Sequence, residues 1–184
     1  MLLMVGGCMG KSQPPRFYTL TPIADGTTAP ALDASVGIGP VKLADYLDQS
    51  RIVTRGNGNL IIEAEFDQWS GSLKDNLTNV MAENIGALLA TDRIFLYPWR
   101  TYMPVDYQVT LDITRLDGQP GGEVFLVARW IVLSGKEKKV IAMKQTKIQE
   151  KTNTGGYEGL VAAQSRALGR LSLEISEALR TSVE

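Results

Sequence analysis

Three acidic side chains alternate along one stretch of the chain and could do acid/base or metal chemistry. Glu63, Glu65 and Asp67 are two residues apart, so in a β-strand they would share one face. Paired carboxylates act as acid and base in some hydrolases, and clustered carboxylate oxygens bind hard cations. The alternative is a solvated strand face next to a helix start, where acidic residues are favoured in any case.

The rest of the composition favours the solvated face over a catalytic or metal site. The 184 residues include no histidine and a single cysteine, which removes the commonest general base, the commonest metal ligand and any Cys/His zinc site. The formal net charge of -1 also argues against nucleic acid as a partner, because phosphate binding requires a clustered basic face. We therefore predict a protein that is not an enzyme, with no catalytic residue, no metal site and no cofactor.

A β-hairpin must position these acidic residues. Residues 51–55 and 60–64 are rich in β-branched and apolar residues and flank a turn at residues 56–59, whose Gly and Asn residues tolerate positive φ. An earlier strand at residues 36–39 is expected to end at Pro40, which has no N–H to give to a ladder. This part of the chain is therefore predicted to hold three strands.

Two amphipathic helices are predicted after the hairpin and at the end of the chain. Apolar residues return every three or four positions over residues 72–90 and again over residues 156–181, which is the spacing of one helix face. Ser72 and Asp75 form an S-x-x-D start for the first helix. The apolar stripe of each helix is expected to cover a sheet.

Further strands complete the predicted fold. Period-2 alternation and turn residues predict strands at residues 16–20, 93–99, 107–114, 123–133 and 139–150, the last three as an antiparallel meander. We predict an α+β fold with a mixed, largely antiparallel sheet of about seven strands and two amphipathic helices packed on it. With 44% hydrophobic residues in the chain, residues 17–184 can form one domain with its own core.

The single cysteine lies where a lipoprotein signal would end. Residues 1–8 are largely apolar, and Gly6 and Gly7 stand directly before Cys8, as in a lipobox, where the cysteine after the cleavage site is acylated. The basic start and full apolar length of a secretory signal are missing, so we interpret residues 1–8 as a truncated lipoprotein signal. The alternative is an apolar N-terminus with a chance cysteine. Residues 9–16 then form a polar tether.

A short turn after the first of the three strands carries two apolar residues in a polar setting. Tyr46 and Leu47 stand among Asp45, Asp48 and Gln49. An aromatic and an aliphatic side chain held between two strands suit a contact with a partner protein, so Asp45, Tyr46 and Leu47 are our candidate partner-binding residues. The alternative is that Tyr46 and Leu47 fold under and close the open end of the sheet.

Lysines gather in and after the last predicted turn. They are Lys136, Lys138, Lys139, Lys144 and Lys147. Such a cluster could meet lipid headgroups or an acidic partner. Lysines on an exposed edge strand also prevent sheets from pairing edge to edge, and we favour that interpretation.

Several of these motifs together resemble one family of lipoproteins. The runs GIGPVKLADYLDQSRIVTR and AEFDQWSGSL, preceded by Phe17-Tyr18-Thr19-Leu20 and by Cys8, are similar to the pattern of the paraquat-inducible protein C family. In words, that pattern is a Gly-Pro-Val strand end, an acidic Tyr-Leu turn, a Val-Thr-Arg strand and a Phe-Asp-x-Trp entry into a helix. The resemblance covers most of the chain in the expected order.

The resemblance implies a role in lipid transport. Members of this family are auxiliary lipoprotein subunits of ABC-type and mammalian-cell-entry (MCE) lipid transporters. By that resemblance the chain is a periplasmic lipoprotein, anchored in the outer membrane through acylated Cys8, that docks or caps an MCE-domain subunit and helps to maintain membrane integrity. Met9 agrees with this, because it is not the Asp that resembles an inner-membrane retention signal. A homo-oligomer, a free-standing envelope module that binds lipid or peptidoglycan, and the small hydrolase remain open.

Overall fold

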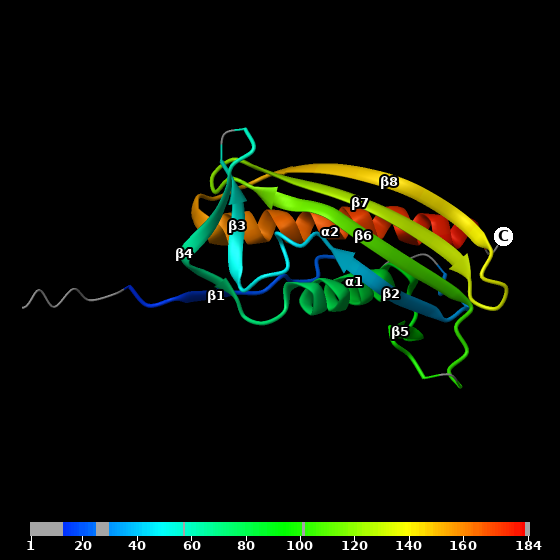
Figure 1. The fold of residues 1–184 in the computed structure, drawn as a ribbon. Coiled ribbons are helices and arrows are strands. Elements are labelled where there is room, and N and C mark those ends of the chain that lie inside the picture. The colour runs from blue at the N-terminus through cyan, green and yellow to red at the C-terminus, as the bar shows by residue number, and fades with distance from the viewer. Residues whose placement is uncertain (1–12, 25–29, 57, 101, 183–184) are drawn as a thin grey trace, which may run out of the picture.

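Eight strands and two helices make up the part of the chain that the computed structural model describes, which is residues 13–24, 30–56, 58–100 and 102–182. The strands form two mixed sheets, and both helices pack on the concave face of the larger one (Figure 1). This confirms the predicted α+β class with two amphipathic helices. The strands divide between two sheets, however, where the sequence predicted one.

The larger sheet has five strands in the order β5-β2-β6-β7-β8. Strand β2 runs parallel to both of its neighbours, whereas β6, β7 and β8 form the predicted antiparallel meander. The bounds are Val36–Leu43 for β2, Ile94–Leu96 for β5, Tyr107–Gly118 for β6, Glu123–Ser134 for β7 and Val140–Lys151 for β8. Strands β5 and β8 are therefore the two edges of this sheet.

The smaller sheet has three strands in the order β1-β4-β3. Strands β3 (Arg51–Arg55) and β4 (Ile61–Trp69) form the predicted hairpin, and β1 (Arg16–Tyr18) pairs in parallel with the last residues of β4. The turn after β2 carries the chain out of the larger sheet, so the three strands predicted near one another lie in two different sheets. Figure 1 shows the β3–β4 hairpin standing across one end of the larger sheet.

Helix α1 (Leu73–Leu89) follows β4 after a short connection. The Ser72 hydroxyl accepts a hydrogen bond from the Asp75 backbone N–H at 3.2 Å, which is the predicted capped start and satisfies one free donor of the first turn. Leu77, Met81 and Ile85 are fully buried on one face. The helix ends at Ala90, whose left-handed backbone terminates the hydrogen-bond series.

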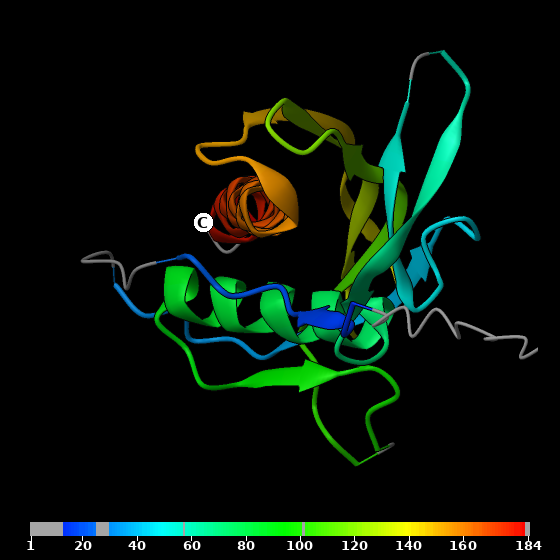
Figure 2. The same ribbon diagram turned by 90° about the vertical axis from the view of Figure 1, so that its left-hand side faces the viewer.

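Helix α2 (Gly156–Thr181) lies inside the curve of the larger sheet. Figure 2, which looks along the molecule, shows strands β6 to β8 curling around this helix and α1 lying beside it. Leu160, Leu168, Leu171 and Ile175 are fully buried against the sheet and α1, and each contributes about 2 kcal/mol through burial of its side chain. The opposite, convex face of the larger sheet carries no helix among the described residues.

Strand β2 does not end at Pro40, as the sequence predicted, but continues to Leu43. Its pairing with β6 shifts register between Ile38 and Val41, so Pro40 lies in an irregularity of the ladder. Its pairing with β5 ends at Ile38. No paired strand on the β5 side therefore requires an N–H from Pro40, and the strand passes through it.

Candidate functional site

A fully buried carboxylate near the end of β6 joins the two sheets. Asp117 belongs to β6, is 0% exposed and is bonded to Arg55 of the β3–β4 hairpin. Its Oδ1 accepts hydrogen bonds from Arg55 Nε at 3.1 Å and from Arg115 Nε at 2.9 Å. Its Oδ2 accepts hydrogen bonds from Arg55 Nη2 at 2.9 Å and from the Tyr46 hydroxyl at 2.6 Å. We call these four residues the Asp117 cluster.

The charges of the Asp117 cluster follow from its contacts. Burial acts to raise the pKa of Asp117, but hydrogen bonds from Arg55, Tyr46 and Arg115 outweigh it and hold that pKa below its ordinary value. Burial, together with the hydrogen bond to Asp117, raises the pKa of Tyr46 to about 12. The hydrogen bond to Asp117 likewise raises the pKa of Arg55. At neutral pH the cluster therefore contains a carboxylate, two guanidinium groups and a neutral phenol.

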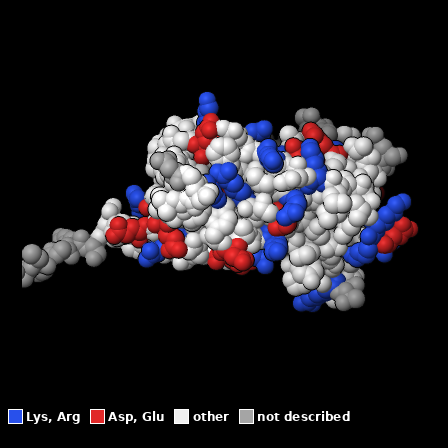
Figure 3. Space-filling model, turned by 45° about the horizontal axis from the view of Figure 1, so that its top comes forward, with Lys and Arg blue, Asp and Glu red and all other residues white. Residues whose placement is uncertain are grey.

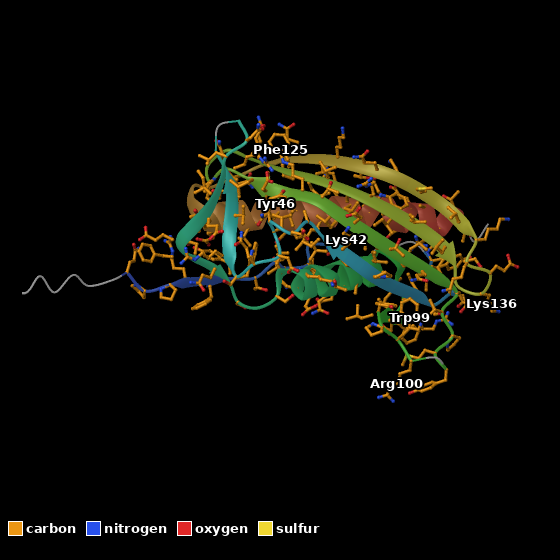
Figure 4. All side chains as sticks on the ribbon, in the orientation of Figure 1. Lys42, Tyr46, Trp99, Arg100, Phe125 and Lys136 are labelled. Atoms are coloured by element: carbon orange, nitrogen blue, oxygen red, sulfur yellow. The ribbon has the colours of Figure 1, made fainter. Side chains whose placement is uncertain are left out.

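This arrangement is suited to holding elements together. Both oxygens of Asp117 already accept two hydrogen bonds, so the carboxylate has little capacity left to act as a general base. Arg55 and Arg115 also line a groove of about 350 Å³ with Phe125, whose ring centre lies 4.4 Å from the Arg115 guanidinium carbon. Figure 4 shows Tyr46 and Phe125 toward the same end of the larger sheet. Arg55, Arg115 and Asp117 were not among the site residues predicted from the sequence.

The structure separates the three candidate partner-binding residues. Leu47 is only 3% exposed and belongs to the hydrophobic core, so it folds under and does not present the docking surface that we predicted. Tyr46 is half-buried, with its hydroxyl bound to Asp117. Asp45 is exposed. A partner contact through Asp45 and the outer side of Tyr46 stays a prediction.

The alternating acidic residues lie on β4 but do not form one site. Glu63 and Glu65 are exposed, whereas Asp67 is 3% exposed. Asp67 accepts hydrogen bonds from Arg16 Nη2 at 2.8 Å and from the Tyr18 hydroxyl at 2.7 Å, both on β1. One acid thus fastens β1 to β4, and the other two face solvent. No group of His, Cys, Asp or Glu side chains suited to a metal ion occurs among the described residues.

The lysine-rich hairpin lies where the sequence predicted it, with β8 as an edge strand. Lys144 and Lys147 are exposed on β8, and Lys144 Nζ lies 3.3 Å from a Glu174 carboxylate oxygen on α2. Lys138 Nζ donates a hydrogen bond to the Gln108 side chain at 2.8 Å. Figure 3 shows Lys and Arg side chains spread over the middle of the face that includes the top of the molecule in Figure 1. The proposed lipid attachment residue, Cys8, lies outside the described residues.

A scan against protein families identifies the class of protein. The family model described as "ABC-type transport auxiliary lipoprotein component" matches residues 18–176, and the chain belongs to this family. The match covers strands β2 to β8, α1 and most of α2, and it confirms the family resemblance seen in the sequence motifs. A search of curated proteins finds no match. Within the described part of the chain, no helix combines the length and apolar character needed to cross a bilayer.

Solved structures share the fold at low sequence identity. A protein from Xanthomonas campestris, assigned to the family DUF330, is 14% identical with a TM-score of 0.76, and the alignment covers 91% of this chain and 95% of that one. Another structure, described as an uncharacterized protein, is 16% identical with a TM-score of 0.75, and the alignment covers 91% of this chain and 99% of that one. The hypothetical protein CT253 from Chlamydia trachomatis is 12% identical with a TM-score of 0.50, and the alignment covers 82% of this chain and 98% of that one.

Proposed function

We propose that this chain is the lipid-anchored auxiliary subunit of a lipid transport system built around an MCE-domain protein. In this proposal, acylated Cys8 holds the domain at the periplasmic face of the outer membrane, where it docks or caps the MCE-domain subunit and so helps to maintain membrane integrity. The observation that carries the proposal is the family match over residues 18–176. The lipobox-like residues that end at Cys8 support the anchor.

The described residues also support a binding role over a catalytic one. Both oxygens of Asp117 are occupied, Asp67 is bound to β1, and Glu63 and Glu65 stand apart from any nucleophile–base pair. A protein that works by binding needs a rigid body and an accessible surface. The Asp45 and Tyr46 turn is one surface that we propose for the partner, because Asp45 is exposed and Tyr46 is held by Asp117 while remaining partly exposed.

Affinity purification of the full-length, tagged lipoprotein from detergent-solubilised envelope tests this function. We expect an MCE-domain subunit to be retained and identified by mass spectrometry, together with other subunits of its transporter. An unrelated outer-membrane lipoprotein, purified in parallel, controls for capture by the detergent micelle. Recovery of the lipoprotein without any transporter subunit would count against the proposal.

A further inference from the structure

The long edge strand β8 is closed at one end by side chains of helix α2. Arg170 Nη1 donates a hydrogen bond to the Gln149 carbonyl oxygen at 3.3 Å, and Arg166 Nη2 donates one to the Lys151 carbonyl oxygen. Both carbonyl groups therefore point away from β7, toward the free edge. These two arginines occupy backbone acceptors that an added strand would need, so this end of the edge is protected.

The rest of the edge is open, and the pairing pattern shows which residues face it. In an antiparallel pair, successive residues direct their backbone groups alternately toward the partner strand and away from it. Thr152 donates its N–H to the Gly122 carbonyl oxygen at 2.9 Å, so even-numbered residues of this strand face β7. Met143, Gln145 and Lys147 consequently direct their N–H and C=O groups outward. Within the described ranges, no other element makes a backbone hydrogen bond to these three residues.

Apolar side chains accompany this open edge. Met143 is 68% exposed and Ile141 is 37% exposed, which is unusual for side chains at the edge of a sheet, where charges normally discourage pairing. Met143 also lines a groove of about 580 Å³ on the convex face of the sheet, together with Ile131 and Arg129. The side chains of a strand added at this edge would continue the convex face beside Met143 and Lys147.

The segment that carries the open edge has a positive net charge. Residues 134–151, which span the last turn and β8, contain six lysines and two glutamates, although the whole chain has a net charge of -1. Figure 4 shows Lys136 in the turn at one end of this hairpin. An incoming segment with acidic side chains would be attracted here, whereas a basic segment would be repelled.

The free strand edges of a second copy of this chain do not provide such an acidic segment. Two β8 edges placed together would oppose lysines with lysines, and the other edge strands, β1, β3 and β5, contain no acidic residue. Like charges directly opposite one another destabilise a strand pair. The acidic strand β4 has neighbours on both sides within its sheet, so it has no free edge to offer. Charge complementarity therefore favours a different protein.

We propose that the open edge of β8, at residues 143–147, receives an extended acidic segment of a partner protein as an added β-strand. The main-chain groups of Met143, Gln145 and Lys147 would provide the hydrogen bonds. Apolar and acidic side chains of the segment would lie beside Met143 and Lys147, respectively. The identity of that partner as the MCE-domain subunit rests on the proposed function, whereas the binding mode does not.

A pair of substitutions at Gln145 separates backbone pairing from side-chain contact. Gln145→Pro removes an outward N–H and blocks a neighbouring strand, while an edge position tolerates proline. Gln145→Ala keeps the N–H and is the matched control. We expect Gln145→Pro to reduce retention of the partner about tenfold and Gln145→Ala to leave it within about twofold. Lys147→Glu, which leaves the backbone unchanged, should reduce retention as well. Thermal melts verify that each variant is folded.

Two further measurements identify the occupant and the binding mode. A photo-crosslinking residue at position 145 in the full-length lipoprotein should attach, in cells, to an acidic segment of another protein, whereas one at Glu83, exposed on α1, should not attach to that segment. A synthetic peptide of the mapped segment should then slow amide hydrogen exchange at Met143, Gln145 and Lys147 by about tenfold or more. The amides of Lys144, Thr146 and Ile148, which face β7, serve as the internal reference.

The outcomes distinguish this inference from the proposed function. If the wild-type chain retains the MCE-domain subunit and Gln145→Pro retains it equally, the edge inference is overturned and the proposed function stands. If the wild-type chain retains no MCE-domain subunit while the crosslink and the exchange pattern identify an acidic segment of another protein, the edge inference stands and the proposed function fails. Crosslinking to a second copy of this chain, to lipid alone or to no protein overturns the edge inference.

Discussion

Arg55 on β3 binds the fully buried carboxylate of Asp117 on β6 through two parallel hydrogen bonds of 3.1 and 2.9 Å. The two residues are 62 positions apart and belong to different sheets. A bidentate pair of this kind fixes both distance and orientation. The position of the β3–β4 hairpin on the larger sheet therefore depends on the buried charge of the Asp117 carboxylate.

We predict that Asp117→Asn lowers the free energy of unfolding by about 3 kcal/mol, because Arg55 and Arg115 lose the charge that balances them. Urea unfolding at pH 7 measures the change. Asp112→Asn is the matched control on the same strand, since its pair with Arg129 is partly exposed and is worth about 0–1 kcal/mol. Equal stability of the two variants would show that the Asp117 cluster does not hold the sheets together.

The same cluster predicts a dependence of stability on acid. The folded chain holds the pKa of Asp117 below its ordinary value, so this carboxylate stabilises the fold fully above its unfolded-state pKa of about 3.9. That contribution is lost as the pH falls through the folded pKa. The stability difference between the wild type and Asp117→Asn should therefore shrink below about pH 4. Urea midpoints from pH 7 to pH 3 test this, and a constant difference would contradict it.

Tyr46 and Leu47 should respond differently to substitution. Leu47→Ala is expected to cost about 2–5 kcal/mol of stability because it opens a cavity in the core. Tyr46→Phe keeps the ring and removes only the hydrogen bond to Asp117, for an expected cost of about 1.5 kcal/mol. Alkaline absorbance titration adds a direct check, since the tyrosinate step that disappears in Tyr46→Phe should be the one near pH 12.

Substitutions of the three acidic residues of β4 should also differ in their effect on stability. Glu63→Gln and Glu65→Gln alter exposed side chains and are expected to change stability by less than about 0.5 kcal/mol, with complementation intact. Asp67→Asn weakens the contacts to Arg16 and Tyr18, so it should cost about 1–2 kcal/mol and make β1 easier to cleave by limited proteolysis. A stable Glu63 or Glu65 variant that lost all function would instead revive the hydrolase hypothesis.

Cys8→Ala, expressed from the full-length gene, should release the protein from the membrane into the soluble periplasmic fraction. Each buried CH₂ of an acyl chain contributes about 0.8 kcal/mol, so a multiply acylated cysteine anchors almost permanently and its loss removes nearly all of the affinity. Fractionation of the envelope measures the change. Membrane partitioning equal to that of the wild type would rule out Cys8 as the anchor.

Local patterns predicted most of the secondary structure. The residues predicted for the last helix are those of α2, and the first predicted helix, 72–90, differs from Leu73–Leu89 by one residue at each end. Both helices carry a regular apolar stripe, and the Ser72 cap lies within the same segment. The antiparallel meander of β6, β7 and β8 could also be predicted from the sequence, because short turns join its three strands.

The division into two sheets and the Asp117 cluster could not be predicted in this way. The predicted strand stopped at residue 114, whereas β6 continues to Gly118 and so includes Arg115 and Asp117. These polar residues remain in the strand because Asp117 pairs with Arg115, two positions away, and with Arg55, a distant partner that sequence spacing does not indicate. The sequence did contain one signal, because Arg115 and Asp117 continue the every-second-residue pattern of β6. Their role in joining the two sheets follows only from the burial of Asp117 with Arg55.

The short parallel pairing of β1 with β4 has a mechanical consequence. A chain tethered at its N-terminal side would feel any tension first at Arg16, and the pairing of β1 together with the two side-chain bonds to Asp67 would carry that load into β4. Strand β4 ends at Trp69, which is buried, and α1 begins only a few residues later. Tension would therefore pass toward the buried core around Trp69 and α1, along a route that includes neither the β3–β4 turn nor the β8 edge.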